Sequence, residues 1–161
     1  MSAQTAVQKT TAQKPISPLG QRMLDEMRKG TDLDTTLRFL ADAATAGLSV
    51  RVTMILGHPG ERPSDIEASA ASLEESADRI ERVALNRFAL VTGSRLHRSL
   101  EREPAALADL GALRPNHRQA LLDHQFAPAR EPAYRRAVRR LLGAVHRINR
   151  RPIREAASEF E

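Results

Sequence analysis

A seven-residue segment, Gly57-His58-Pro59-Gly60-Glu61-Arg62-Pro63, has the residue types best suited to chemistry in this chain. Two glycines and two prolines in so short a stretch demand a tight loop. His58 is a candidate cofactor contact, but a single histidine without partners is more often a tolerated loop residue. Glu61 is a candidate general base, yet no second carboxylate or histidine is spaced to work with it. An acid favoured by the macrodipole at a helix entry is the more common outcome, so we assign no catalytic residue.

The absence of cysteine limits the chemistry of the chain most strongly. It excludes disulfides, thiol nucleophiles and thiolate metal sites. It also excludes a cysteine-ligated iron–sulfur cluster held by this chain. The histidines outside the loop show no metal-ligand spacing, and we assign no metal-binding residue; they are His97, His117, His124 and His146.

Hydrophobic periodicity predicts that regular elements flank this loop on both sides. The expected elements are a helix over residues 18–29, a helix over 33–46, a strand over 48–56, a helix over 64–77 and a strand over 80–91. Thr31 or Asp32 can cap the second helix, and Gly47 suits the position just after its end. Ser64 and Glu67 have capping-box spacing at the start of the third helix. Two strands separated by a helix predict a right-handed parallel βαβ unit.

The pattern after Leu96 predicts further helices. Short helices are expected over residues 104–113 and 116–124, and a longer one over 134–148. The apolar stripe of the long helix is Ala137, Val138, Leu141, Leu142, Val145 and Ile148. Its opposite side has Arg135, Arg136, Arg139, Arg140 and Arg147.

Positive charge is concentrated near the C-terminal end of the sequence. The formal net charge is +5, and residues 130–154 contain nine arginines but only one acid, Glu131. Two interpretations remain open at this point. The basic helix binds RNA or an acidic face of a protein partner, or its arginines form the solvated face of a helix that packs on the rest of the fold. Aromatic residues are only 3% of the chain, which supplies little base stacking and makes nucleic acid the less expected partner.

Three segments resemble, in order, the second half of the barrel of radical S-adenosylmethionine (SAM) enzymes. Gln21-Arg22-Met23-Leu24-Asp25-Glu26-Met27-Arg28-Lys29-Gly30 resembles the helix after the fourth strand. Gly47 to Glu61, including Met54-Ile55-Leu56-Gly57-His58-Pro59-Gly60-Glu61, is similar to the fifth strand and its loop. Phe88 to Leu96, with Gly93-Ser94, is similar to the sixth strand and its exit. The class with a cobalamin-binding domain ahead of the barrel, and its methylthiotransferase-like relatives, are the most similar.

The resemblance implies a cofactor role for four residues. Ile55 and Gly57 would shape the adenine site of SAM, and Gly60 and Glu61 belong to the same loop, which Glu61 would fix without reacting. In a parallel barrel such a loop lies at the C-terminal ends of the strands, where ligands bind. Arg62 stands where the family often has threonine or serine.

The family's chemistry requires parts that do not match this sequence. Intact relatives hold a 4Fe-4S cluster on a Cys-x₃-Cys-x₂-Cys loop and cleave SAM to a 5′-deoxyadenosyl radical, and some bind cobalamin. This chain has no cysteine, and Ile16-Ser17-Pro18-Leu19-Gly20 does not match the SAM contacts expected after the fourth strand. We therefore expect a fragment that is inactive alone, from a split, frameshifted or degenerate gene. It would self-associate or need a separately encoded barrel half.

The sequence thus predicts an α/β protein: a partial parallel barrel followed by a helical C-terminal region. The expected organisation is a disordered leader over 1–16, a radical SAM-like partial barrel over 17–100 and a helical region with the basic amphipathic helix over 101–161. No apolar run is long enough to span a bilayer, and the start lacks the apolar stretch of a secretory signal, which favours the cytoplasm. The alternative function is a non-catalytic basic module that binds RNA or an acidic protein.

Overall fold

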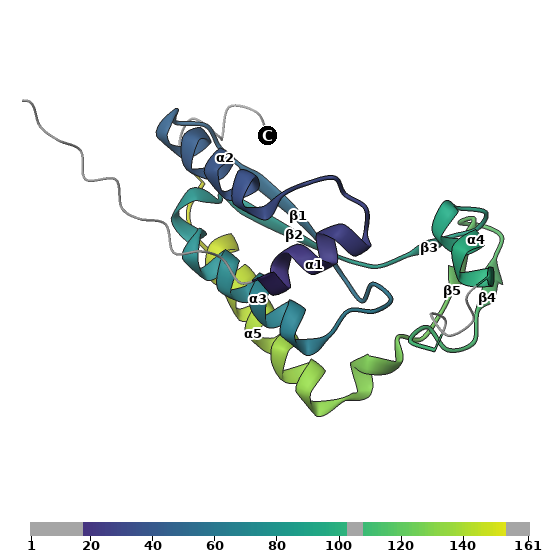
Figure 1. Ribbon diagram of the computed structural model, residues 1–161. Helices are drawn as coiled ribbons and strands as arrows, with labels where there is room; N and C mark the ends of the chain where they lie inside the picture. Colours follow the sequence, from purple (N-terminus) through teal and green to yellow (C-terminus); the bar gives the residue numbers. More distant parts are fainter. Residues whose placement is uncertain (1–17, 103–107, 154–161) are drawn as a thin grey trace, which may run out of the picture.

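The computed structural model describes residues 18–102 and 108–153, and it arranges them as a mixed α/β main body with a smaller lobe (Figure 1). The main body contains α1 (Pro18–Glu26), α2 (Leu33–Thr45), β1 (Arg51–Leu56), α3 (Pro63–Glu75), η1 (Ala77–Arg79), β2 (Arg82–Arg87) and α5 (Pro132–Asn149). The lobe contains β3 (Leu90–Val91), α4 (Arg95–Arg102), β4 (Arg114–Asn116) and β5 (Leu121–Asp123), and η3 (Ala127–Arg130) leads from it to α5. The leader predicted over 1–16 lies outside the described residues.

Both ends of α2 are closed by the residues that the sequence indicates. The Asp32 carboxylate accepts a 2.8 Å hydrogen bond from the Thr35 amide, so Asp32 is the N-cap. At the other end Gly47 adopts φ +75°, a left-handed conformation that glycine tolerates well. The Gly47 amide donates to the carbonyl of Ala44, and the Leu48 amide donates to that of Ala43. This pair of bonds is a Schellman motif, and it turns the chain from α2 into β1.

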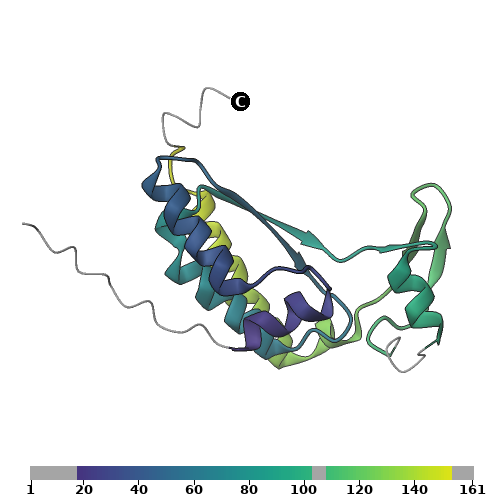
Figure 2. The same cartoon turned by 45° about the horizontal axis from the view of Figure 1, so that its top comes forward.

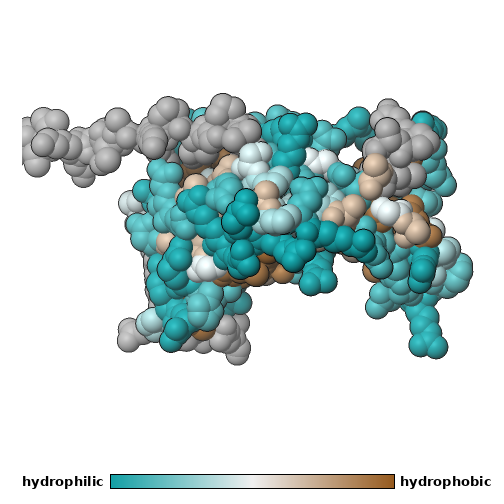
Figure 3. Space-filling model, turned by 90° about the horizontal axis from the view of Figure 1, so that it is seen from below, coloured by the Kyte–Doolittle hydropathy of each residue, from teal (hydrophilic) through white to brown (hydrophobic). Residues whose placement is uncertain are grey.

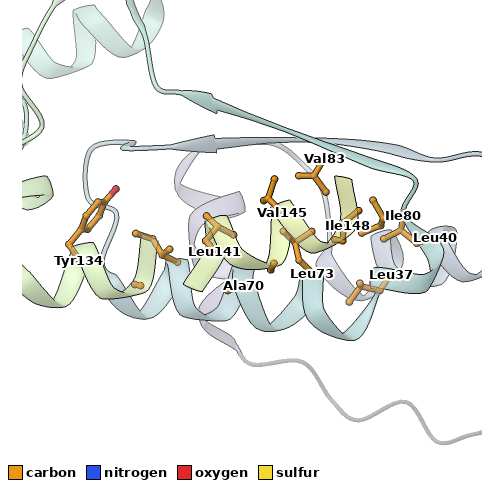
Figure 4. Close-up of a cluster of buried hydrophobic side chains, with 13 residues drawn as sticks. Leu37, Leu40, Ala70, Leu73, Ile80, Val83, Tyr134, Leu141, Val145 and Ile148 are labelled. Carbon is orange, nitrogen blue, oxygen red and sulfur yellow. The ribbon is translucent and has the colours of Figure 1, made fainter. Parts of the chain in front are cut away.

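The parallel βαβ unit predicted from the sequence is confirmed. β1 and β2 pair in parallel, in a register that runs from Arg51 opposite Arg82 to Leu56 opposite Arg87. α3 and α5 pack on one face of this strand pair and enclose the main core (Figure 4). The buried members of that core are Leu37, Leu40, Ile66, Ala70, Leu73, Ile80, Val83, Tyr134, Ala137, Leu141, Ala144, Val145 and Ile148.

The other face of the strand pair is not covered by any described helix (Figure 2). Thr53 on β1 and Ala84 and Asn86 on β2 are exposed there, whereas Val52 and Val83 face the core. Parallel sheets are usually covered on both faces, so this face differs from an ordinary parallel sheet. Its exposed residues are mostly polar or small, in contrast to the continuous apolar face expected of a buried strand pair.

The start of α3 differs from the prediction. The helix begins at Pro63, which has no amide hydrogen to satisfy and is favoured at a first helical position. Its capping carboxylate is Asp65, which accepts a 2.8 Å hydrogen bond from the Arg62 amide. The predicted capping box of Ser64 and Glu67 is therefore wrong, and Glu67 is bonded to Arg140 of α5 at 2.6 Å instead.

A single strand over 80–91 is also wrong, because the chain forms two short strands in different sheets. β2 ends at Arg87, and β3 pairs antiparallel with β5 in the lobe. The alternation of apolar residues is interrupted between β2 and β3. Val83 and Leu85 are two residues apart, but Leu85 and Phe88 are three apart. That shift sends Leu90 into a second core with Leu100, Leu110 and Leu122.

The helix predicted over 116–124 is wrong as well. β4 and β5 form an antiparallel hairpin, with Asn116 opposite Leu121 and Arg114 opposite Asp123. Of the helix predicted over 104–113, residues 104–107 lie outside the described part, and residues 108–110 form a turn. The C-terminal region is therefore helical only in part.

The long basic helix is confirmed as α5, with two differences in its apolar stripe. Leu142 is 48% exposed, and the buried stripe includes Tyr134 and Ala144. On the basic side, Arg140 forms ion pairs with Glu67 and Glu74 of α3, and Arg147 pairs with Glu74. These two arginines join α5 to α3, which agrees with the interpretation of a helix packed on the fold.

Hydrophilic residues dominate the surface seen in Figure 3, with smaller hydrophobic areas between them.

Candidate functional site

The loop after β1 is folded back on itself by its own backbone and one carboxylate. Gly57 adopts φ +87°, and its amide donates a 2.8 Å hydrogen bond to Oε2 of Glu61. The Glu61 amide donates to the carbonyl of His58 at 3.0 Å. The loop begins where β1 ends, at the C-terminal edge of the parallel strand pair, because both strands run in the same direction.

Glu61 fastens this loop to α5. Its side chain is only 8% exposed, and the Tyr134 hydroxyl donates a 2.6 Å hydrogen bond to the same Oε2 that accepts from Gly57. Burial raises the pKa of Glu61, although the hydrogen bonds from Tyr134 and Gly57 oppose the shift. Burial, together with the bond to Glu61, also raises the pKa of Tyr134. Two protein donors bond to Oε2 of this carboxylate, which suits it to holding the loop in place.

The far side of the loop is fastened by α1 and by the lobe. The Gly60 amide donates to Oδ2 of Asp109 at 2.8 Å, and its carbonyl accepts from Nη2 of Arg22 at 2.8 Å. Arg22 also forms an ion pair with Asp65, whose side chain is 2% exposed, and its Nε donates to Oδ1 of Asp65 at 3.1 Å. The loop is thus tied to three separate parts of the chain.

Sequence reasoning missed Arg22, Asp109 and Tyr134 as residues of this site. They lie 38, 49 and 73 residues from their partners in the loop. A sequence pattern carries no signal for contacts at such separations. The one available signal was chemical, because a buried tyrosine needs a partner for its hydroxyl.

His58 is a packed loop residue in the structure. Its Nδ1 lies 2.8 Å from the Pro59 carbonyl, and its ring meets Phe88 edge to face at a centroid distance of 5.1 Å. Burial lowers the pKa of His58, so the imidazole is uncharged near neutral pH. This environment favours packing over a role in proton transfer.

Two cavities adjoin the loop and divide the four residues predicted to contact a cofactor. A cavity of about 840 Å³ lies at the strand ends, lined by Gly57, Phe88, Phe126 and Tyr134 among others. A cavity of about 400 Å³ lies between α1, α2 and β1, lined by residues that include Ile55 and Glu61. Gly60 lines neither of these two cavities. The structure therefore brings Gly57 and Glu61 into contact but places Ile55 and Gly57 on different hollows.

The metal chemistry that the resemblance implies does not fit this chain. Within residues 18–102 and 108–153, no group of three or more histidine, aspartate or glutamate side chains is arranged to hold a metal ion. The full sequence contains no cysteine, so it offers no thiolate to a 4Fe-4S cluster.

No helix in the described part is long and apolar enough to cross a membrane.

The chain is similar to known proteins over only part of its length. The chain is 33% identical to the ribosomal protein uS12 methylthiotransferase RimO of Flavobacterium psychrophilum and 35% identical to that of Flavobacterium johnsoniae. Each similarity covers 63 residues, which are 38% of this chain and only 14% of the relative. No family model matches the chain, and no solved structure does. Both relatives are methylthiotransferases, the kind of enzyme to which the resemblance of residues 21–96 points. The similarity therefore supports that resemblance at the level of the superfamily.

Proposed function

We propose that residues 47–96 are part of the second half of a radical SAM barrel and that the loop from Gly57 to Glu61 contacts the adenine of SAM. The partial similarity to methylthiotransferases supports the proposal, and so does the parallel βαβ unit formed by β1, α3 and β2. The loop lies at the C-terminal edge of the strand pair, the edge at which parallel barrels bind their ligands. The cytoplasm is the compartment that goes with this proposal.

One observation carries the proposal furthest: the bonds from Gly57 and Tyr134 to Glu61 fix the loop before any ligand arrives. Ligand sites in proteins are usually preformed, because ordering a loop on binding would reduce affinity. A glycine backbone can approach a flat ring closely, since it has no Cβ. A Cβ at Gly57 would point toward the ring of Phe126 at 3.8 Å, so any side chain there would occupy the space at the strand end.

The role proposed for this chain is to bind and position, not to react. SAM, where bound, would supply the group that is cleaved, but the cluster that cleaves it needs thiolates that this chain does not contain. Glu61 would keep the loop in shape, whereas Ile55 lines the other hollow and is left out of the proposed contact. Cysteines from another segment or another chain, such as a separately encoded barrel half, would be required for catalysis.

Calorimetric titration of SAM into the purified chain tests this proposal. We expect binding by the wild type and loss of binding by Gly57→Val, because valine resists the left-handed backbone and fills the space beside Phe126. Gly47→Val is the matched control, since Gly47 also has a left-handed backbone but lies at the end of α2. Gly47→Val should be destabilised and still bind. No heat of binding at millimolar SAM with the folded wild type would overturn the proposal.

A further inference from the structure

Four arginines surround a hollow between α1 and the lobe. The hollow has a volume of about 410 Å³ and is lined by Arg28, Arg95, Arg98, Ser99 and Arg102. Arg28 follows the end of α1, and the other residues lie on α4. All four arginines are exposed, and among the described residues no aspartate or glutamate lines the hollow. The long basic helix α5 contributes no residue to it.

The periodicity of α4 explains why its arginines converge. At 3.6 residues per turn, residues 95, 98, 99 and 102 fall on one side of a helix. Leu100 is buried in the core of the lobe, so it anchors another side of α4. Glu101 lies 3.7 Å from His97 on a third side, one turn away along the helix. The acidic residue of the helix is therefore turned away from the arginines.

Such an arrangement favours an anion. Like charges that converge repel one another, and the repulsion is stronger where water is partly excluded. The planar guanidinium group donates paired hydrogen bonds that match the oxygens of a phosphate. The residues that the structure describes around the hollow include no apolar or aromatic side chain, so they offer no surface to an acyl chain or a stacked base. The hollow is therefore suited to contact the phosphate groups of a ligand and not its bases or acyl chains.

We propose that this hollow binds phosphate groups, and specifically those of a single-stranded RNA backbone. Arg95, Arg98 and Arg102 are spread over the eight residues of α4, about 10 Å from the first to the last, which presents several donors along a line. A line of guanidinium groups fits a chain of phosphates better than one isolated ion. The proposal differs from binding through α5, whose Arg140 and Arg147 are engaged by Glu67 and Glu74. The proposed phosphate site does not depend on whether the chain binds SAM.

Fluorescence anisotropy with a labelled single-stranded RNA, measured over a range of salt concentrations, tests this inference. We expect the triple variant Arg95→Gln, Arg98→Gln and Arg102→Gln to bind at least about tenfold more weakly at low salt. The slope of log K against log salt should fall by about 2, because three contacts are removed at about 0.7 each for single strands. Arg28→Gln, on a different element, should weaken binding in the same direction.

The matched control removes the same charge from α5 and its C-cap residue. Arg136→Gln, Arg139→Gln and Arg150→Gln replace three exposed arginines and should leave most of the affinity and the salt slope in place. Equal losses in the two triple variants would overturn the proposal, as would failure of the wild type to bind either RNA or pyrophosphate. Binding of pyrophosphate without RNA, lost in the α4 variant, would overturn the RNA backbone as the occupant and assign the site to a small polyphosphate. Binding of poly-glutamate in preference to both probes would contradict it.

Discussion

The hydroxyl of Tyr134 on α5 donates a 2.6 Å hydrogen bond to Oε2 of Glu61, a residue that lies 73 positions earlier in the loop after β1. The same oxygen accepts the Gly57 amide at 2.8 Å. One buried carboxylate therefore fixes the shape of the loop and joins it to the longest helix of the fold. The geometry at the end of β1 depends on α5 as much as on the loop's own glycines.

Tyr134→Phe should lower the free energy of unfolding by about 1–3 kcal/mol, because it leaves a buried carboxylate with one donor fewer. Urea denaturation monitored by circular dichroism would measure the change. Glu61→Gln and the double variant complete a thermodynamic cycle, and the two substitutions should be coupled by at least about 0.5 kcal/mol. Strict additivity of the two effects would show that the bond contributes nothing to stability.

The stability of the wild type relative to Glu61→Gln should fall as the pH rises. Burial raises the pKa of Glu61 in the folded protein, so the folded state keeps a proton that the unfolded chain releases above about pH 4.3. The resulting stabilisation is complete below that pH and is lost as the pH rises through the raised pKa. Urea titrations of both proteins from about pH 4 to about pH 7 would reveal the trend. A wild type that gains stability over glutamine in this window would mean that the pKa is lowered.

Asn149 should matter more than an exposed asparagine usually does. Its Oδ1 accepts the Val83 amide at 2.8 Å and its Nδ2 donates to the Val83 carbonyl at 2.9 Å, so it closes the outer edge of β2. Asn149→Ala should cost about 1–2 kcal/mol in the free energy of unfolding. Asn149→Asp keeps the acceptor but loses the donor, and thermal melts should place its stability below the wild type. An unchanged melting temperature for both variants would contradict this role.

Arg140→Gln should lower stability only slightly, and the loss should shrink with added salt. Arg140 bonds to Glu67 at 2.6 Å and to Glu74 at 2.8 Å, but all three side chains are partly open to solvent. Exposed ion pairs contribute up to about 1 kcal/mol, and salt screens them. Arg136→Gln on the exposed side of the same helix is the control and should have no effect. Urea melts of the two variants at low and high salt would separate them, and a salt-independent loss would point to packing of the arginine stem.

The elements with local signals could be predicted from the sequence. Asp32 and Gly47 predict the two ends of α2, and the apolar run before Gly57 predicts β1. The alternation of strand, helix and strand was enough to predict the parallel pairing. These features depend on neighbours in the sequence, so short-range patterns capture them.

Features that depend on distant residues could not be predicted. The turn between β4 and β5 places Ala120 at φ +54°, a left-handed conformation for which no glycine or asparagine gives a signal at that position. The contact of Glu61 with Tyr134 and that of Gly60 with Asp109 arise only once the lobe and α5 have folded against the loop. The arrangement of Arg28 and the arginines of α4 around one hollow also depends on residues that are distant in the sequence.

Titration of SAM into ¹⁵N-labelled chain, followed by NMR, is the sharpest test of whether the loop from Gly57 to Glu61 contacts SAM. Glycine amides give well-separated signals, and the chain supplies Gly57 and Gly60 in the loop and Gly47 and Gly93 outside it. We expect SAM to shift the signals of residues 55–61 and to leave those of Gly47 and Gly93 unchanged. Absence of any shift at millimolar SAM, or shifts confined to residues far from the loop, would contradict it.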